Sequence, residues 1–217
     1  MAISTGFGEL DALLAGGYET DIVTTIYGPA GSGKTTLCIL AAANTGRTKK
    51  VIYIDTENNF SIERLKQIAP DYEKFFENIL LLKPGSFSEQ KSIFKQLCEN
   101  YDERVGLIII DTIVMLYRVE RCRANSYELS TELGLQVTCL GGLARKKNVP
   151  VIMTSQVYTN LQNETKMVGG DLIGYASKCV IELQNFNNLH RLILKKHRSV
   201  ASNTMDYKIS SQGFTPR

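Results

Sequence analysis

The chain has 217 residues, of which 43% are hydrophobic and 22% are charged, and its formal net charge at pH 7 is +3. This composition is ordinary for a globular protein and provides for one sizeable core, so we expect a single domain over residues 1–217. A net charge this small is no evidence by itself for a nucleic-acid partner. The apolar runs are far shorter than a membrane span requires, and we expect no secretory signal in the N-terminal residues.

The first two thirds of the chain alternate between apolar runs that favour strands and periodic segments that favour helices. Strands are predicted at 22–27, 51–55, 79–82, 105–110 and 150–155. Helices are predicted between them at 34–45, 61–69, 87–100 and 126–147. This alternation indicates an α/β fold whose mostly parallel, twisted sheet has helices on both faces.

Two of the predicted helices have recognisable ends. Ser86 followed by Glu89 is a capping box, in which each side chain accepts a hydrogen bond from a free backbone N–H. Arg145, Lys146 and Lys147 close the long fourth helix, where cations suit the helix dipole. The basic triplet therefore has a structural explanation, and we do not assign it to DNA contact.

The chain changes character after Gln156. Residues 157–171 are polar, contain glycine and lack a clear period, which predicts a mobile loop. Short strands are then predicted at 178–184, 189–194 and 204–209. We therefore expect the parallel sheet to continue into C-terminal antiparallel strands.

Residues 28–35, GPAGSGKT, match the phosphate-binding P-loop pattern in full, between a predicted strand and a predicted helix. The glycines allow backbone N–H groups to curl around a phosphate. Lys34 brings a cation to the β and γ phosphates, and the Thr35 hydroxyl can ligate Mg²⁺. The predicted nucleotide-binding residues are Gly28, Pro29, Ala30, Gly31, Ser32, Gly33, Lys34, Thr35 and Thr36.

Two carboxylates, Asp55 and Glu57, follow the predicted strand at 51–55. Because binding residues gather at the carboxyl ends of parallel strands, this turn is expected near the phosphate pocket. Hydrolysis of a γ-phosphate needs a group that orients or deprotonates water, and Glu57 is the candidate base. Asp55 is interpreted as a turn-forming or supporting residue, since an Asp at a strand end commonly bonds its own backbone.

Two further polar residues end apolar strands. Asp111 ends the run LIIID and is the candidate Mg²⁺ anchor, directly or through water, with a turn-forming Asp as the alternative. Gln156 follows the strand at 150–155 and can hydrogen-bond the γ-phosphate. Hydrolysis would remove that partner, so Gln156 is predicted to link the phosphate state to the loop that follows.

Other classes of P-loop protein are less well supported. A GTPase needs an N-K-x-D motif to read guanine, and the sequence has none. A small-molecule kinase needs an arginine-rich lid over the phosphates. Arg118, Arg121 and Arg123 could supply such a lid, so that alternative stays open.

The cysteines show no short paired spacing, and the two histidines do not complete a set of metal ligands. We therefore expect neither a zinc site nor a disulfide framework. Free thiols in a reducing cytoplasm are the expectation. The cysteines are Cys38, Cys98, Cys122, Cys139 and Cys179.

With these motifs in this order, the sequence resembles the RecA superfamily of recombinases. ISTGFGELDALLAGG at 3–17 is similar to the segment that precedes the P-loop in archaeal and eukaryotic members. YIDTE, LIIID and TSQV are similar to the family's catalytic-glutamate, Mg²⁺ and sensor strands. The resemblance covers nearly the whole chain and implies a RecA-like P-loop NTPase core.

The resemblance is greatest to short archaeal paralogues that lack an N-terminal helical DNA-binding domain. It implies ATP and Mg²⁺ as cofactors, weak hydrolysis, binding to single-stranded or branched DNA, and assistance to recombination and repair. The implied partners are a host RadA-type recombinase or repair proteins, and a homodimer or small oligomer is possible. Ser155 replaces the usual Asn, the loop after Gln156 is short, and no linker precedes Ile3, so filaments and strand exchange are not expected.

YRVERCR at 117–123 combines a tyrosine with Arg118, Arg121 and Arg123. The first two arginines are spaced to share a helical face, and arginine suits bidentate phosphate contact. The segment matches the place of the first DNA-binding loop in the resembled family, which implies DNA contact. The alternative is a solvated charged turn.

KKHRS at 195–199 carries Lys196 and Arg198. In relatives that assemble into rings or filaments, a K-x-R arrangement reaches the γ-phosphate of a neighbouring subunit and stabilises charge in the transition state. A DNA phosphate contact and a solvent-facing hairpin are the alternatives, and the sequence does not rank the first two.

The leading hypothesis is an ATP- and DNA-binding protein of recombinational repair. A second hypothesis is a nucleotide-gated RecA-like module or kinase, related to the clock-type kinases, that acts on protein partners without DNA. ATP-dependent assembly or autophosphorylation without DNA affinity would favour the second.

Overall fold

The structure is a computed structural model that describes residues 1–122, 126–160, 165–186 and 189–217. Its main strands are β3 (Val23–Tyr27), β4 (Lys50–Asp55), β5 (Ile79–Leu82), β6 (Val105–Asp111), β7 (Val151–Ser155), β10 (Cys179–Phe186), β11 (Leu189–Lys196), β12 (Thr204–Ser210) and β13 (Gly213–Pro216). Its helices are α1 (Gly8–Leu13), α2 (Lys34–Gly46), α3 (Ile62–Ile68), α4 (Phe87–Glu99), α5 (Met115–Arg121), α6 (Ser126–Lys147) and α7 (Gly170–Ala176). Two short 3₁₀ helices cover Tyr72–Lys74 and Phe76–Asn78.

Over the described residues, the main strands form one nine-stranded sheet in the order β13-β12-β11-β10-β3-β7-β6-β4-β5. The strands from β10 to β5 in this order pair in parallel. The strands from β10 to β13 pair antiparallel. The predicted α/β fold with a parallel sheet and C-terminal antiparallel strands is therefore confirmed.

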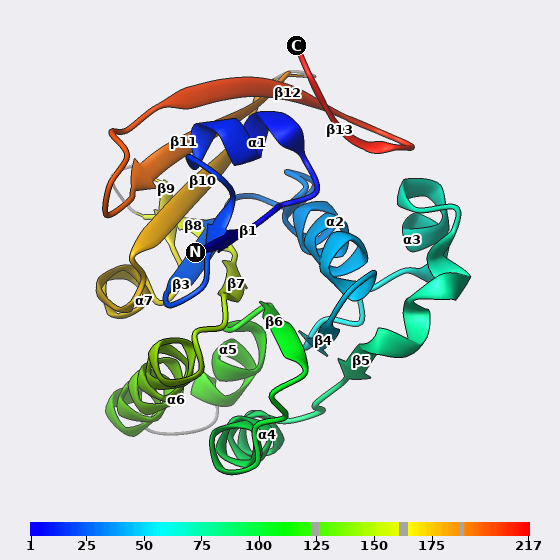
Figure 1. Ribbon diagram of the computed structural model, residues 1–217. Coiled ribbons are helices and arrows are strands. Elements are labelled where there is room, and N and C mark those ends of the chain that lie inside the picture. Colours follow the sequence, from blue (N-terminus) through cyan, green and yellow to red (C-terminus); the bar gives the residue numbers. More distant parts are fainter. Residues whose placement is uncertain (123–125, 161–164, 187–188) are drawn as a thin grey trace.

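The sheet separates two hydrophobic cores, because successive side chains of a strand point to opposite faces. In β4, Val51 and Tyr53 join one core, whereas Ile52 and Ile54 join the other. The first core also contains residues of α1, α2 and α3, and the second contains residues of α4, α5, α6 and α7. Figure 1 shows α2 and α3 on one side of the sheet and α4, α5 and α6 on the other.

The segment after Gln156 differs from the predicted mobile loop. β8 (Val157–Thr159) and β9 (Thr165–Met167) pair as antiparallel strands, and α7 follows. A second short pair joins β1 (Ala2–Ile3) to β2 (Tyr18–Glu19). These strands have two or three residues each, too few to produce a readable period in the sequence.

The predicted capping box at α4 is half correct. The Ser86 hydroxyl accepts a hydrogen bond from the Glu89 N–H at 3.1 Å, as expected of an N-cap. The Glu89 carboxylate instead accepts from the N–H of Gly85 at 2.8 Å. The reciprocal bond is thus made one residue earlier than the motif predicts.

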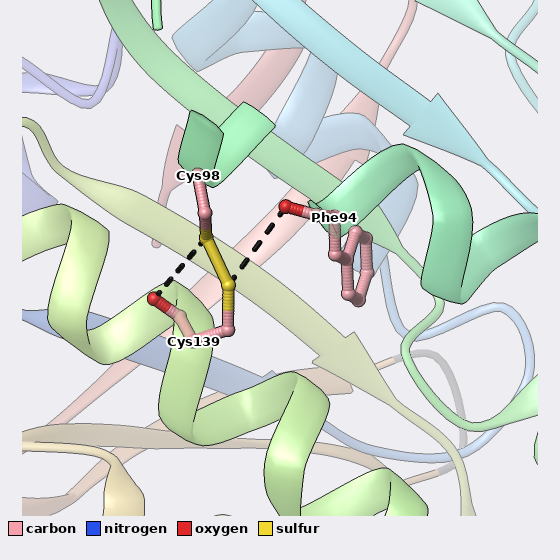
Figure 2. The surroundings of a disulfide bond; sticks show 3 residues. All are labelled: Phe94, Cys98 and Cys139. Carbon is pink, nitrogen blue, oxygen red and sulfur yellow. Dashed lines mark hydrogen bonds between the residues drawn. A yellow bond between two sulfur atoms is a disulfide. The ribbon is translucent and has the colours of Figure 1, made fainter. Parts of the chain in front are cut away.

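Cys98 and Cys139 form a disulfide, so the prediction of free thiols is wrong for this pair. Figure 2 shows the bond between α4 and α6, with Phe94 beside it. The pairing depends on the packing of two helices whose cysteines lie 41 residues apart, which no short sequence spacing reveals. Among the described residues, Cys38, Cys122 and Cys179 are free.

None of the helices in the described part of the chain combines the length and the hydropathy that a membrane span requires.

Candidate nucleotide-binding site

The register of the parallel strands brings four polar turns to one edge of the sheet. Asp55 pairs with Asp111 across β4 and β6, and Tyr27 pairs with Ser155 across β3 and β7. The residues that follow these strand ends, including the P-loop, Glu57 and Gln156, therefore leave the sheet at the same level.

A cavity of about 960 Å³, the candidate nucleotide cavity, opens at this edge. It is lined by every predicted nucleotide-binding residue except Gly28 and Ser32. Glu57, Asp111 and Gln156 line the same cavity, so the three strand-end residues converge on it as predicted. The other lining residues are Asn59, Arg64, Gln67, Thr112, Arg118, Val157, Ile209, Ser210 and Ser211.

The P-loop curls because two glycines adopt left-handed backbone conformations, with φ of 73° at Gly31 and 93° at Gly33. Lys34 reaches back over the loop, and its ammonium donates to the carbonyls of Gly28 at 2.8 Å and Pro29 at 2.9 Å. Burial lowers the pKa of Lys34, although the carboxylates of Asp111 and Glu57 oppose this shift. Phosphate oxygens would offer the ammonium stronger acceptors than these neutral carbonyls.

Asp111 is held by three hydroxyl donors. Thr35 Oγ1 and the Tyr53 phenol donate to its Oδ2 at 2.8 and 2.9 Å, and Thr154 Oγ1 donates to Oδ1 at 2.5 Å. Burial raises the pKa of Tyr53, which keeps the phenol protonated as a donor. A fixed carboxylate beside the Thr35 hydroxyl provides the hard oxygen ligands that Mg²⁺ prefers.

Glu57 also has a defined position. Its Oε1 accepts from Gln156 Nε2 at 2.7 Å and from Thr112 Oγ1 at 3.0 Å, and its Oε2 accepts from Asn59 Nδ2 at 3.0 Å. The side chain is partly buried and faces the cavity that Lys34 lines. A carboxylate oriented this way can accept a proton or align a water molecule within the cavity.

Asp55 forms the turn that presents Glu57. Its Oδ1 accepts from the N–H groups of Glu57 at 3.3 Å and Asn59 at 3.1 Å, and its Oδ2 accepts from the Phe60 N–H at 3.0 Å. The interpretation of Asp55 as a turn-forming residue is therefore confirmed.

Gln156 connects Glu57 to the arginine segment. Its amide nitrogen donates to Glu57, and its Oε1 accepts from Arg118 Nη1 at 2.6 Å. The predicted DNA-binding residue Arg118 thus lies in the nucleotide cavity. Of the roles expected for the arginine segment, only the lid over the phosphates implied this position for Arg118.

Arg121 lies on α5, as the helical spacing predicted, but lines a neighbouring cavity of about 650 Å³ that Arg118 also reaches. Tyr158 of β8 and Gly169 line this second cavity from the other side. Arg123 lies outside the described residues. Arg118 and Arg121 belong to a helix rather than to a turn, and both are exposed to solvent, so DNA contact stays a prediction and a solvated charged surface stays the alternative.

The far wall of the nucleotide cavity comes from residues that no sequence motif singled out. Arg64 and Gln67 of α3 face Ile209 and Ser211 near the end of β12. Arg64 Nη1 donates to Gln67 Oε1 at 3.0 Å and to the Ser211 carbonyl at 3.1 Å. This wall adds the planar side-chain groups of Arg64 and Gln67 and the apolar side chain of Ile209 to the cavity.

Lys196 and Arg198 lie outside the nucleotide cavity of their own chain. Lys196 Nζ donates to the Gly174 carbonyl at 2.9 Å. Arg198 bonds Glu19 at 2.8 Å and both oxygens of Asp21 at 2.8 Å, which lowers the pKa of Asp21. A role of these cations toward a neighbouring subunit or DNA stays a prediction.

Comparisons with known proteins agree with this geometry. The Rad51 family model matches residues 1–216. The chain is 37% identical to the DNA repair and recombination protein RadB of Methanobrevibacter smithii, with 94% of this chain and 92% of that protein covered. RadB of Archaeoglobus fulgidus is 38% identical, with 100% and 99% covered.

A comparison with solved structures also finds a RadB protein. A crystal structure of the RadB recombinase matches with a TM-score of 0.84 and 32% identity, and 99% of each chain is covered. The P-loop, the three strand-end residues and this similarity over the full length point to one conclusion. The chain belongs to the Rad51 family of the RecA superfamily, in which it is a RadB-like recombinase paralogue.

Proposed function

We propose that this protein binds ATP with Mg²⁺, hydrolyses it slowly, binds DNA and assists homologous recombination and repair. The observation that carries the proposal is the convergence of Lys34, Asp111, Glu57 and Gln156 on one cavity. The relatives named RadB, described as DNA repair and recombination proteins, support the process. ATP and Mg²⁺ fit the P-loop, the hydroxyl of Thr35 and the fixed carboxylate of Asp111.

Each cavity residue has a proposed task. The P-loop amides and Lys34 bind the phosphates, and Thr35 and Asp111 hold Mg²⁺, which when bound neutralises phosphate charge. Glu57 accepts a proton from water or aligns it. Gln156 senses the terminal phosphate, because its amide can exchange the Glu57 bond for a phosphate oxygen. The wall at Arg64 and Ser211 receives the base.

We place DNA at the second cavity, between α5 and the β8–β9 pair. Arg121 supplies a cation, and Tyr158, which is 49% exposed, supplies an aromatic face on which a base can stack. Arg118 reaches both cavities and bonds Gln156, so phosphate state and DNA contact would share this residue. Single-stranded or branched DNA, with accessible bases, suits such a surface.

We further propose that the protein works in the cytoplasm beside a RadA-type recombinase or repair proteins, without strand exchange of its own. A homodimer or small oligomer would let Lys196 or Arg198 reach a neighbour's phosphates, because neither lines its own nucleotide cavity. Slow hydrolysis by a monomer follows if those cations act only across an interface.

Anisotropy with labelled single-stranded DNA at two salt concentrations, combined with ATP turnover and mass in solution, tests the proposal. We expect measurable binding whose affinity falls as salt rises, because phosphate contacts release counterions. Absence of binding at low salt would refute the DNA component. ATP-dependent assembly or autophosphorylation without DNA affinity would instead support a nucleotide-gated module that acts on protein partners.

A further inference from the structure

The C-terminal strands contact two consecutive residues of the P-loop. The Tyr207 phenol of β12 donates to the Ser32 carbonyl at 2.6 Å. The Phe214 ring of β13 lies against Gly33, where an added Cβ would come within 2.6 Å of Phe214 Cζ. The two rings are stacked, with centroids 4.5 Å apart. A small aromatic unit therefore supports the loop where the chain enters α2.

The bond to Ser32 constrains the orientation of the next amide. The Ser32–Gly33 peptide is trans, and in a trans peptide the C=O and the following N–H point in opposite directions. Holding the Ser32 carbonyl against Tyr207 therefore turns the Gly33 N–H away from β12. Gly33 lines the nucleotide cavity, whereas Ser32 is fully buried. The constrained N–H is thus directed to the side where phosphate would bind.

Tyr207 itself is rigidly placed. It is fully buried, it pairs with His190 of β11 in the sheet, and the two rings stack at 5.2 Å. Burial raises the pKa of Tyr207, so its hydroxyl stays protonated and remains a donor at any physiological pH. The hydroxyl therefore has a fixed position, set by the sheet rather than by the loop.

We propose that Tyr207 is a positioning residue for nucleotide binding, and that with Phe214 it fixes the P-loop peptide whose N–H receives phosphate. The inference rests on the proposed nucleotide binding. It assigns the C-terminal strands a part in phosphate recognition, although neither ring lines the nucleotide cavity.

Tyr207→Phe tests the proposal, because it retains the ring and removes only the hydroxyl. The probe is mant-ATP with Mg²⁺, titrated by fluorescence at a temperature where circular dichroism shows each variant to be folded. Loss of one neutral hydrogen bond should weaken binding about three- to ten-fold. Tyr101→Phe is the matched control, since the Tyr101 phenol donates to a main-chain carbonyl, that of Val105, at 2.7 Å away from the cavity.

The control separates positioning from general stability. Both variants lose a tyrosine-to-carbonyl bond, but only Tyr207→Phe should weaken mant-ATP binding at a temperature where both variants are folded. Phe214→Leu, which removes the ring beneath Gly33, should weaken binding in the same direction and serves if Tyr207→Phe does not fold.

Each outcome decides a different point. Wild-type affinity in a folded Tyr207→Phe or Phe214→Leu protein, or an equal loss in Tyr101→Phe, would overturn the positioning role while nucleotide binding stands. Failure of the wild-type protein to bind mant-ATP would overturn the proposed function and the inference together.

Discussion

Gln156 donates its amide hydrogen to Glu57 at 2.7 Å, although the two residues lie 99 positions apart in the sequence. The bond joins the carboxyl end of β7 to the turn after β4, across the cavity that also contains Lys34. The same glutamine accepts from Arg118, so the candidate base, the candidate sensor and an arginine form one connected chain of hydrogen bonds. Each member can be tested separately.

Glu57→Gln should retain nucleotide affinity and lose turnover by about 10²- to 10⁴-fold, because the amide keeps the shape but cannot accept a proton. Affinity is measured with mant-ATP, and turnover by phosphate release. Glu63→Gln, which changes an exposed carboxylate on α3, serves as the control and should behave like the wild type. Unchanged turnover in the Glu57 variant would remove this residue from the mechanism.

Lys34→Ala should abolish nucleotide binding. The ammonium now bonds two neutral carbonyls, and a triphosphate would replace them with charged acceptors, so its loss removes the main cationic contact of the P-loop. Mant-ATP titration measures the effect. Lys91→Ala removes an exposed lysine paired with Glu132 and should leave affinity unchanged. Binding by the Lys34 variant at wild-type affinity would contradict the phosphate assignment.

Replacing Arg118 by Ala and replacing Arg121 by Ala should have different effects on ATP turnover. Arg121→Ala is expected to lower DNA affinity and to leave nucleotide affinity unchanged. The slope of the logarithm of DNA affinity against the logarithm of salt concentration should become shallower by about one phosphate contact. Arg118→Ala is expected to lower DNA affinity and also to change turnover, because it removes the partner of Gln156 Oε1. DNA anisotropy and phosphate release measure the two effects.

Arg47→Ala provides the control for these two variants, since Arg47 pairs with Asp71 outside both cavities. The triple replacement of Arg118, Arg121 and Arg123 should eliminate DNA binding while ATP still binds. Full DNA affinity in the triple variant would exclude the segment as the DNA contact.

Reduction of the Cys98–Cys139 disulfide should lower the free energy of unfolding by about 2–4 kcal/mol, because the bond closes a long loop in the unfolded chain. Urea unfolding with and without dithiothreitol measures the change. In the double variant Cys98→Ser and Cys139→Ser, dithiothreitol should have no effect on the midpoint. A wild-type midpoint that dithiothreitol leaves unchanged would mean that the bond contributes nothing to stability.

Arg198→Ala should move acid unfolding to higher pH. Arg198 lowers the pKa of Asp21, so the folded state favours the charged carboxylate. A carboxylate with a lowered pKa stabilises the fold fully above its ordinary pKa, and this contribution is lost as the pH falls through the lowered value. Circular dichroism during acid titration measures the midpoint, with Lys196→Ala as the control, whose amine contacts a carbonyl. Coincident midpoints for wild type and Arg198→Ala would refute the coupling.

The parallel part of the sheet was predictable because its strands are buried on both faces and read as uninterrupted apolar runs. The convergence of the P-loop, Glu57, Asp111 and Gln156 could be predicted because each lies at the end of such a run or just after it. The antiparallel pair of β8 and β9 was missed because its strands are short and mostly exposed, so burial imposes no alternation on them.

Side-chain contacts between elements that are distant in the sequence could not be predicted from sequence patterns. Tyr53 and Thr154 occupy strand positions that read as core, and only the packed sheet shows their hydroxyls donating to Asp111. The wall at Arg64 and Ser211 likewise joins α3 to the end of β12, which are distant in the sequence. Tertiary packing determines these contacts, and local sequence propensity does not encode tertiary packing.

The residues that line the nucleotide cavity are spread along the sequence from Pro29 to Ser211, so no single segment of the chain forms the complete binding site. Nucleotide binding therefore stabilises only the fully folded state, and this stabilisation grows with the logarithm of the nucleotide concentration. Partial openings that release the C-terminal strands would therefore be suppressed together with global denaturation. At saturating nucleotide, hydrogen exchange in β4 and in β12 should slow in parallel, as one cooperative unit.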